Sequence, residues 1–440
     1  MKIGFVSLGC SKNLVDTEVM LKRLADAGYT ITPDETEADI IVVNTCGFIQ
    51  SAKEEAIDNI LDVAWLKKNR ALKGIIATGC LVERYREQVL EEMPEVDAVL
   101  GTGSYHKIVE AVEAVARGEK YASFEDKNAA PLGGERIVTT PPYTAYLKVA
   151  EGCDNRCTYC AIPLIRGRMR SRRMEDVVAE AKSLEKIGVK ELNIIAQDTS
   201  RYGLDLYGKY MLPELVQKIL DETQIPWIRL LYLYPDKITD ELVAVIRDND
   251  RVCKYVDLPI QHVNDTVLAR MNRHGDGAVV RAAVEKIRRE IPGVTLRTTA
   301  IVGFPGETEA QFAELCEFVK ETGFDRFGAF TYSPEEGTPA AEFPDQIDEQ
   351  VKQDRYDTLM AVQLEVSEKK MQEKIGDVIE VLCEGYDPVA GVQYGRSRAD
   401  APDVDGKVYF TSAKKLPEGV FVNVKITKAL DYDLFGEAVR

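Results

Sequence analysis

Short apolar runs alternate with stretches of helical spacing through residues 1–117. The apolar runs predict strands at Lys2–Leu8, Ile40–Asn44 and Gly74–Thr78, with a further short strand at Val99-Leu100. The helical spacing predicts helices over Asp16–Ala27, Ala52–Lys68 and Val82–Met93. Strands that are joined by crossover helices are parallel, so we expect an open parallel α/β sheet.

A second alternating region covers residues 143–370, after a linker predicted at 118–142 from its Gly, Pro and Asn content. Its predicted strands are Tyr143–Val149, Glu191–Ala196, Trp227–Leu233, Tyr255–Leu258, Thr295–Ile301 and Arg326–Phe330. Helices are predicted over Met174–Ile187, Pro213–Glu222, Val279–Arg289 and Glu309–Thr322. Six β/α units indicate a partial TIM-like barrel rather than a complete eight-stranded one.

Residues 376–440 change to short β segments between Gly, Pro and Asp turns. The segments are Asp377–Cys383, Gly391–Arg398, Lys407–Thr411 and Val420–Leu430. They predict a small antiparallel β-barrel, a fold that often binds nucleic acid. This region has eleven Asp and Glu against eight Lys and Arg, a net charge of −3, which does not favour strong RNA affinity.

The composition is that of a multidomain protein without a membrane segment. The chain has 440 residues, and no apolar run approaches the length that a bilayer crossing requires. Its start, Met1-Lys2-Ile3-Gly4-Phe5, predicts a strand rather than a signal peptide, and nine cysteines without an export signal indicate a reducing cytoplasm. The net charge of −17 argues against non-specific nucleic-acid binding; it suits a basic protein partner, and equally plain solubility.

Three cysteines lie within eight residues, in Cys153-Asp154-Asn155-Arg156-Cys157-Thr158-Tyr159-Cys160. Three thiolates in one loop can hold three irons of a cubane iron–sulfur cluster and leave the fourth iron open, whereas electron-carrier clusters are closed by four cysteines. A structural zinc site is the main alternative, but it needs a fourth ligand, and Cys253, His262 and His274 are all distant in sequence. Unevenly spaced thiols in a chain of this length do not fit a disulfide framework.

The N-terminal region repeats the order strand–Cys–helix three times, at Cys10, Cys46 and Cys80. The carboxyl ends of parallel strands share one edge of a sheet, so these cysteines are predicted to converge. Any one of them could be a small buried hydrophobe, but three at equivalent strand ends indicate a second three-cysteine cluster.

Other polar residues follow predicted strands of the central region. Gln197 follows the second strand, and a turn with Gly303 and Glu307 follows the fifth. These strand ends face the mouth of a barrel, where a cofactor binds, although a plain strand-to-helix turn would look the same. Five arginines between Arg166 and Arg173 could hold a carboxylate of the cofactor or substrate, or form a solvated basic turn.

The motif Cys153–Cys160 resembles that of the radical S-adenosylmethionine (SAM) enzymes. This resemblance implies a 4Fe-4S cluster whose open iron chelates SAM, which an electron then cleaves to a 5′-deoxyadenosyl radical. Tyr159, between the last two cysteines, matches the aromatic residue of that family. From strand-end position and resemblance together, we expect SAM to contact Tyr159, Gln197, Gly303 and Glu307.

The whole chain resembles the methylthiotransferases, which combine an N-terminal three-cysteine domain, a radical SAM domain and a C-terminal TRAM barrel. Their six cysteines correspond to Cys10, Cys46, Cys80, Cys153, Cys157 and Cys160. The resemblance implies two 4Fe-4S clusters, with the N-terminal one carrying sulfur that a second SAM methylates. It also implies an external electron donor and a source of sulfide.

Two branches of this family differ in substrate. Stretches such as Ser7–Asp16, Asn44–Ile49 and Asp431–Glu437 are similar to the branch that methylthiolates the β-carbon of an aspartate in small-subunit ribosomal protein S-twelve, free or on the ribosome. The tRNA-modifying branch, which acts on an adenosine base, is the nearer alternative, and a non-catalytic iron–sulfur protein is a more distant one.

Overall fold

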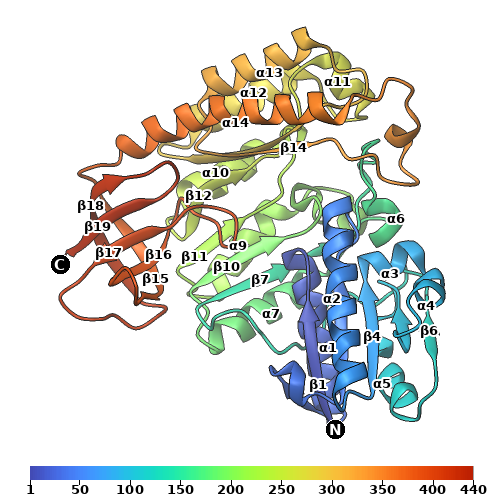
Figure 1. Ribbon diagram of the computed structural model, residues 1–440. Helices are drawn as coiled ribbons and strands as arrows, with labels where there is room; N and C mark the ends of the chain where they lie inside the picture. Colours follow the sequence, from blue (N-terminus) through green and yellow to red (C-terminus); the bar gives the residue numbers. More distant parts are fainter. Residues whose placement is uncertain (440) are drawn as a thin grey trace.

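The structure is a computed structural model that describes residues 1–439, and its strands form two open six-stranded sheets, a closed barrel and one two-stranded pair (Figure 1). An open parallel sheet occupies the N-terminal part, a second one the centre, and a closed barrel the C-terminal part. The predicted α/β multidomain fold is therefore confirmed. Among residues 1–439, no helix has both the length and the apolar character needed to cross a bilayer.

The N-terminal sheet has six parallel strands: the four predicted ones and one more at each edge. In spatial order they are β2 (Thr30–Thr32), β1 (Lys2–Ser7), β3 (Ile40–Thr45), β4 (Gly74–Gly79), β5 (Ala98–Leu100) and β6 (Tyr121–Ser123). The helices are α1 (Ser11–Asp26), α2 (Gln50–Asn69), α3 (Cys80–Tyr85), α4 (Gln88–Glu92) and α5 (Ile108–Ala116). Helices α1 and α5 cover one face of this sheet, and α2 with α3 covers the other.

Three details of this region differ from the prediction. The helix expected over Val82–Met93 is divided into α3 and α4, because Arg86 adopts a φ of 49° that interrupts helical geometry. Strand β2 and helix α5 were not predicted. Strand β6 lies inside the segment predicted as a linker and pairs with β5, so the sheet extends beyond residue 117.

The central sheet consists of the six predicted strands, all parallel and not closed into a full barrel. Their order is β14 (Arg326–Thr331), β13 (Thr295–Val302), β12 (Val252–Asp257), β11 (Trp227–Leu230), β10 (Glu191–Ile195) and β7 (Thr144–Lys148). The helices are α6 (Ile162–Arg166), α7 (Met174–Lys186), α8 (Leu204–Tyr207), α9 (Leu212–Glu222), α10 (Asp240–Asp248), α11 (Asp265–Arg270), α12 (Gly277–Glu290), α13 (Glu309–Thr322) and α14 (Glu349–Gln372). A small antiparallel pair, β8 (Ala150–Glu151) and β9 (Arg170–Ser171), lies beside the motif loop. Single 3₁₀ turns occur at Glu35–Glu37, Tyr105–Lys107, Thr199–Arg201, Pro235–Lys237 and Pro339–Glu342.

The C-terminal barrel closes with five strands, one more than predicted. They are β15 (Val378–Asp387), β16 (Val392–Ser397), β17 (Val408–Thr411), β18 (Phe421–Ala429) and β19 (Leu434–Val439). The unpredicted β19 pairs with β18 antiparallel and with β17 parallel, which closes the barrel.

This barrel docks on the face of the central sheet that the surrounding helices leave free. The Trp227 and Phe421 rings pack with their centroids 4.9 Å apart. Beside them, the buried carboxylate of Glu191 accepts hydrogen bonds from Arg229 at 3.0 Å and from Arg396 of β16 at 2.6 Å. A central strand and the C-terminal barrel are thus joined by one ion-paired carboxylate.

We predict that this contact makes the free energy of unfolding depend on pH in the acidic range. Burial alone would raise the pKa of Glu191, but the guanidinium groups of Arg396 and Arg229 outweigh it and lower the pKa to about 2. Because the folded pKa lies below the ordinary value of 4.5, the stabilisation is complete above that pH and is lost as the pH falls toward about 2. Glu191→Gln removes this dependence and lowers the free energy of unfolding by about 3–5 kcal/mol, because buried Arg229 loses its counter-charge and buried Arg396 keeps only Glu384.

Denaturant unfolding between pH 7 and pH 3 measures both effects. Glu365→Gln is the matched control, since Glu365 is exposed on α14. An equal loss of stability in both variants would contradict the prediction.

Candidate active site between the two sheets

The three N-terminal cysteines lie at the carboxyl ends of adjacent strands. Cys10 follows β1 and caps α1, Cys46 follows β3, and Cys80 follows β4 directly. Strands β1, β3 and β4 are neighbours in the sheet, as the repeated strand–Cys–helix order predicts. The chain is tightly packed there: a Cβ added at Gly9 would lie 3.0 Å from the Cys46 sulfur.

The three thiols influence one another electrostatically. Burial raises the pKa of Cys80 to about 12; the guanidinium of Arg166 opposes this, and the thiols of Cys10 and Cys46 add to it. A bound cation reverses such a shift, since it favours the thiolate. This donor set is chemically suited to a metal group.

The second triad occupies the loop after β8, at the carboxyl end of β7. Burial, aided by Asp198 and Cys157, raises the pKa of Cys153 to about 12, although the Asn155 backbone lowers it. Burial likewise raises the pKa of Cys160, and the thiols of Cys157 and Cys153 add to the shift. The Cys160 amide donates to the Cys157 carbonyl at 3.0 Å, so the loop turns tightly between these residues.

Three other segments anchor this loop. The Asn155 amide donates to Asp198 at 2.7 Å, and the Thr158 hydroxyl donates to the Arg270 carbonyl at 2.8 Å. Thr158 also accepts a hydrogen bond from the amide of Ala340 at 2.9 Å. The motif loop is therefore held from both sides of the barrel mouth.

Helix α6 connects the two triads. It begins at Ile162, and the buried side chains of Ala161, just before it, and of Ile165 pack against Cys80. At the end of α6, Arg166 donates to the Cys80 sulfur at 3.4 Å. The segment that follows Cys160 thus contacts Cys80 of the other triad, a relation that the sequence did not predict.

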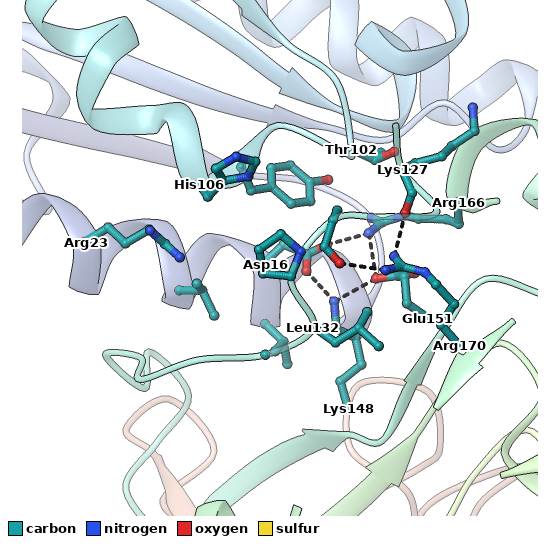
Figure 2. A pocket seen from close by; sticks show the side chains of 17 residues that line it. Asp16, Arg23, Thr102, His106, Lys127, Leu132, Lys148, Glu151, Arg166 and Arg170 are labelled. Carbon is teal, nitrogen blue, oxygen red and sulfur yellow. Dashed lines mark hydrogen bonds and ion pairs between the residues drawn. The ribbon is translucent and has the colours of Figure 1, made fainter. Parts of the chain in front are cut away.

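Three charged side chains surround that arginine, and together the four join the two sheets. Figure 2 shows Asp16, Lys148, Glu151 and Arg166 pointing toward one another. Arg166 donates to Asp16 at 2.5 Å and to Glu151 at 3.3 Å, and Lys148 pairs with both carboxylates. Burial alone would raise the pKa of Glu151, but Lys148 and Arg166 lower it to about 2.

The cavity beside this ion cluster has a volume of about 50 Å³. It is lined by the ion cluster together with Arg23, Thr102, Tyr105, His106, Lys127 and the segment 130–133 (Figure 2). This volume holds a few water molecules but not SAM, which needs a site of several hundred Å³. The cofactor site must therefore be sought elsewhere, at the barrel mouth.

A second contact between the sheets involves the loop after β14. Glu335 in this loop pairs with Lys53 of α2 at 3.1 Å and with Arg84 of α3 at 2.7 Å. Strands β7 and β14 are the two edges of the open central sheet. The N-terminal part therefore contacts loops at both edges of the central sheet, and it spans the gap between β7 and β14 that the incomplete barrel leaves open.

Tyr159 and Gln197 both lie at this mouth. The Tyr159 ring packs against the apolar cluster that contains Phe304 and Tyr332. The Gln197 amide donates to Glu151 at 2.7 Å, while its buried Oε1 accepts no hydrogen bond within residues 1–439. An unused acceptor of this kind suits a ligand that carries N–H donors.

Gly303 and Glu307 are occupied by contacts within the protein. A Cβ at Gly303 would lie 2.3 Å from the Lys352 side chain, and its φ is +71°, so the approach of α14 already requires glycine. The Glu307 carboxylate contacts His262 at 3.2 Å and Arg355 at 2.9 Å, and it also accepts from the Gly303 amide. Their role as cofactor contacts stays a prediction.

The arginine run is largely satisfied by internal partners. Arg170 donates to the carbonyls of Ala130 and Lys127, and Arg172 pairs with Glu180 at 2.6 Å. Arg173 pairs with Asp176 on the surface, and Arg168 is exposed. The expectation that this run holds a cofactor carboxylate has no support in these contacts.

Two residues near the motif were not singled out from the sequence. The Tyr234 hydroxyl lies 3.0 Å from the Cys157 sulfur, and the Arg273 guanidinium lies 3.9 Å from the centroid of the Tyr234 ring. Tyr234 follows β11, so its position after a barrel strand was the available signal.

Within residues 1–439, the structure shows no set of ligands for a single zinc ion. Across residues 1–439, no three His, Cys, Asp or Glu side chains are grouped closely enough to bind a single metal ion. The ligands of one zinc ion all lie about 2.0–2.3 Å from it.

Comparison with family models divides the chain into three parts. Residues 2–101 match "Uncharacterized protein family UPF0004", residues 147–319 match the "Radical SAM superfamily", and residues 375–439 match the "TRAM domain". The first two matches cover most of the N-terminal and central sheets but end before β6 and β14, and the third covers the C-terminal barrel.

Full-length relatives decide the family. A protein from Desulforamulus reducens, named "Ribosomal protein uS12 methylthiotransferase RimO", is 50% identical over 100% of this chain and 99% of its own length. The chain belongs to the RimO family of radical SAM methylthiotransferases. A second member, from Thermoanaerobacter sp. (strain X514), is 50% identical over 99% of both chains. The predicted resemblance and enzyme class are confirmed, and a non-catalytic iron–sulfur protein is excluded.

Solved structures outside the RimO family share the fold. The radical SAM methyltransferase TsrM from Kitasatospora setae, with cobalamin and a [4Fe-4S] cluster bound, has a TM-score of 0.57 at 14% identity, over 77% of this chain and 73% of its own. The cobalamin-dependent SAM radical enzyme OxsB, with aqua-cobalamin and SAM bound, has a TM-score of 0.50 at 10% identity, over 82% of this chain and 56% of its own.

Proposed function

We propose that this protein adds a methylthio group to the β-carbon of an aspartate in ribosomal protein uS12. The single observation that carries the proposal is the full-length identity of 50% to relatives that bear this name. The substrate resides on the ribosome, so we also propose a cytoplasmic location. We further propose the domain division 1–117, 143–370 and 376–440, with β6 as an extension of the first domain.

The residues present fit two 4Fe-4S clusters. Cys153, Cys157 and Cys160 would hold one, and Cys10, Cys46 and Cys80 the other. Each set has three thiols at strand ends, and the unused Gln197 acceptor is available at the mouth for the amino group of SAM. When bound, these groups supply the radical chemistry and the sulfur, which no side chain provides at neutral pH.

The contribution of the chain itself is positioning and exclusion of water. Helix α6 links the two triads, because it follows Cys160 and its residue Ile165 packs with Cys80. Arg166, Asp16 and Glu151 fix the N-terminal sheet against the central one, and the Glu335 contacts do so at the opposite edge. Such rigidity keeps reacting groups within reach and limits side reactions. An external electron donor and a sulfide source complete the proposed reaction.

Mass spectrometry on two substrates tests the proposal. We expect anaerobically reconstituted protein, given SAM, reductant and sulfide, to add a methylthio mass to an aspartate of uS12, isolated or on the ribosome. Undermodified tRNA in a parallel reaction is expected to stay unchanged. A mass gain on the tRNA with none on uS12 would move the enzyme to the tRNA branch of the same chemistry.

A further inference from the structure

Helix α2 carries an exposed apolar ridge that the contacts described above do not use. Ile57, Leu61 and Trp65 are 38%, 50% and 58% exposed, and they recur every fourth residue. Residues four apart lie one above another on a helix, so the three side chains form one continuous line. Single exposed apolar residues are ordinary, but a contiguous line on a helix marks an interaction site.

The ridge starts at the candidate active site. Phe48, in the loop after Cys46, is 37% exposed and precedes α2. Lys53, one turn before Ile57, pairs with Glu335 of the central loop, which places the first turns of α2 beside the barrel mouth. From there α2 runs along the N-terminal sheet and away from the mouth (Figure 1). A partner bound along the ridge would therefore extend into the site.

Carboxylates accompany the ridge along the same exposed face. They are Glu54, Glu55, Asp58 and Asp62, and all four are exposed. Within residues 1–439 none of the four forms an ion pair, although ion pairs are frequent elsewhere on this surface. Unpaired carboxylates beside apolar side chains complement a partner that is both basic and apolar.

We propose that the α2 ridge, defined as Ile57, Leu61 and Trp65 with the four flanking carboxylates, is the docking surface for the substrate protein. The inference rests on the proposed function. A ribosomal protein binds RNA phosphates and must therefore present Lys and Arg, which are the groups that these carboxylates attract. The ridge binds uS12 outside the reacting centre and directs its target segment toward the mouth.

Tryptophan fluorescence measures this binding without any turnover. The chain contains two tryptophans, and Trp227 is fully buried in the docked barrel interface, so Trp65 is the solvent-facing reporter. We expect isolated uS12 to shift the Trp65 emission to shorter wavelength, and the shift to weaken as salt rises. Trp65→Phe is expected to abolish the signal but to keep most of the binding.

Steady-state kinetics separates docking from chemistry. We expect Leu61→Ser and the double variant Asp58→Lys with Asp62→Lys each to raise the KM for uS12 at least tenfold, with kcat changed less than twofold. The formation of 5′-deoxyadenosine without uS12 should equal that of the wild type. Leu206→Ser is the matched control, because Leu206 is 46% exposed on α8 of the central part of the chain.

The outcomes distinguish the two proposals. Normal KM values in the ridge variants, while the wild type modifies uS12, would overturn the docking surface and leave the function standing. Failure of the wild type to modify uS12 would overturn both. A Trp65 response to tRNA but not to uS12 would assign the ridge to the other substrate class and thereby reject this proposal.

Discussion

Cys157→Ala is expected to abolish the reductive cleavage of SAM, whereas Cys46→Ala should leave cleavage intact and stop methylthio transfer. The two cysteines belong to separate triads on separate sheets, so each substitution should remove one cluster. Reconstituted wild type should hold about eight irons per chain and each variant about four. The measurements are 5′-deoxyadenosine by liquid chromatography, the mass of uS12, and iron per chain.

Cys316→Ala provides the control for this pair. Cys316 is a half-buried residue of α13 that packs at the edge of the central core, apart from both triads. It should retain both activities and all of the iron. Loss of SAM cleavage in Cys46→Ala would show that the two triads do not act as separable sites.

The sheets were predictable because their strands are strongly apolar. All six central strands and the three N-terminal strands that precede the cysteines lie where the apolar runs predicted them. The short strands β2 and β6 were missed because three residues at a sheet edge are only partly buried and leave little pattern. The closing strand β19 alternates weakly, and its glycine obscures a strand pattern.

The relation between the triads could not be predicted, because it depends on contacts between domains. The repeated strand–Cys–helix order predicted which cysteines share a sheet edge. It carried no information on how that edge meets the barrel mouth. The contacts of Arg166 with Cys80, 86 residues away, and with Asp16, 150 residues away, exist only in the folded chain. Likewise, the pattern of Gly303 predicted a turn but not that α14 would pack against it.

Arg166→Met is expected to reduce methylthio transfer at least about tenfold, which corresponds to about 1.4 kcal/mol, while SAM cleavage continues. Arg166 is a positioning residue: it donates to the Cys80 sulfur at 3.4 Å and to Asn13 at 3.0 Å from the same nitrogen. Hydrogen bonds and positive charge near a ligating sulfur raise the reduction potential of a cluster. Without the guanidinium, the reduction potential of the N-terminal cluster should become more negative.

A redox titration followed by electron paramagnetic resonance tests this directly. The titration uses a chain in which Cys153, Cys157 and Cys160 are alanine, so that only the N-terminal cluster contributes a signal. Arg166→Lys keeps the positive charge but not the paired N–H donors. Its reduction potential should therefore lie between those of Arg166→Met and the parent chain.

Lys148→Met distinguishes electrostatic tuning from simple loss of domain contact. Lys148 belongs to the same buried ion cluster, through Asp16 and Glu151, and within residues 1–439 it has no contact with a cysteine sulfur. Its removal leaves two buried carboxylates with one cation, so stability should fall. The potential should stay near that of the parent chain, because the Arg166–Cys80 hydrogen bond remains. If Lys148→Met and Arg166→Met shifted the potential equally, Arg166 would act only by holding the two sheets together.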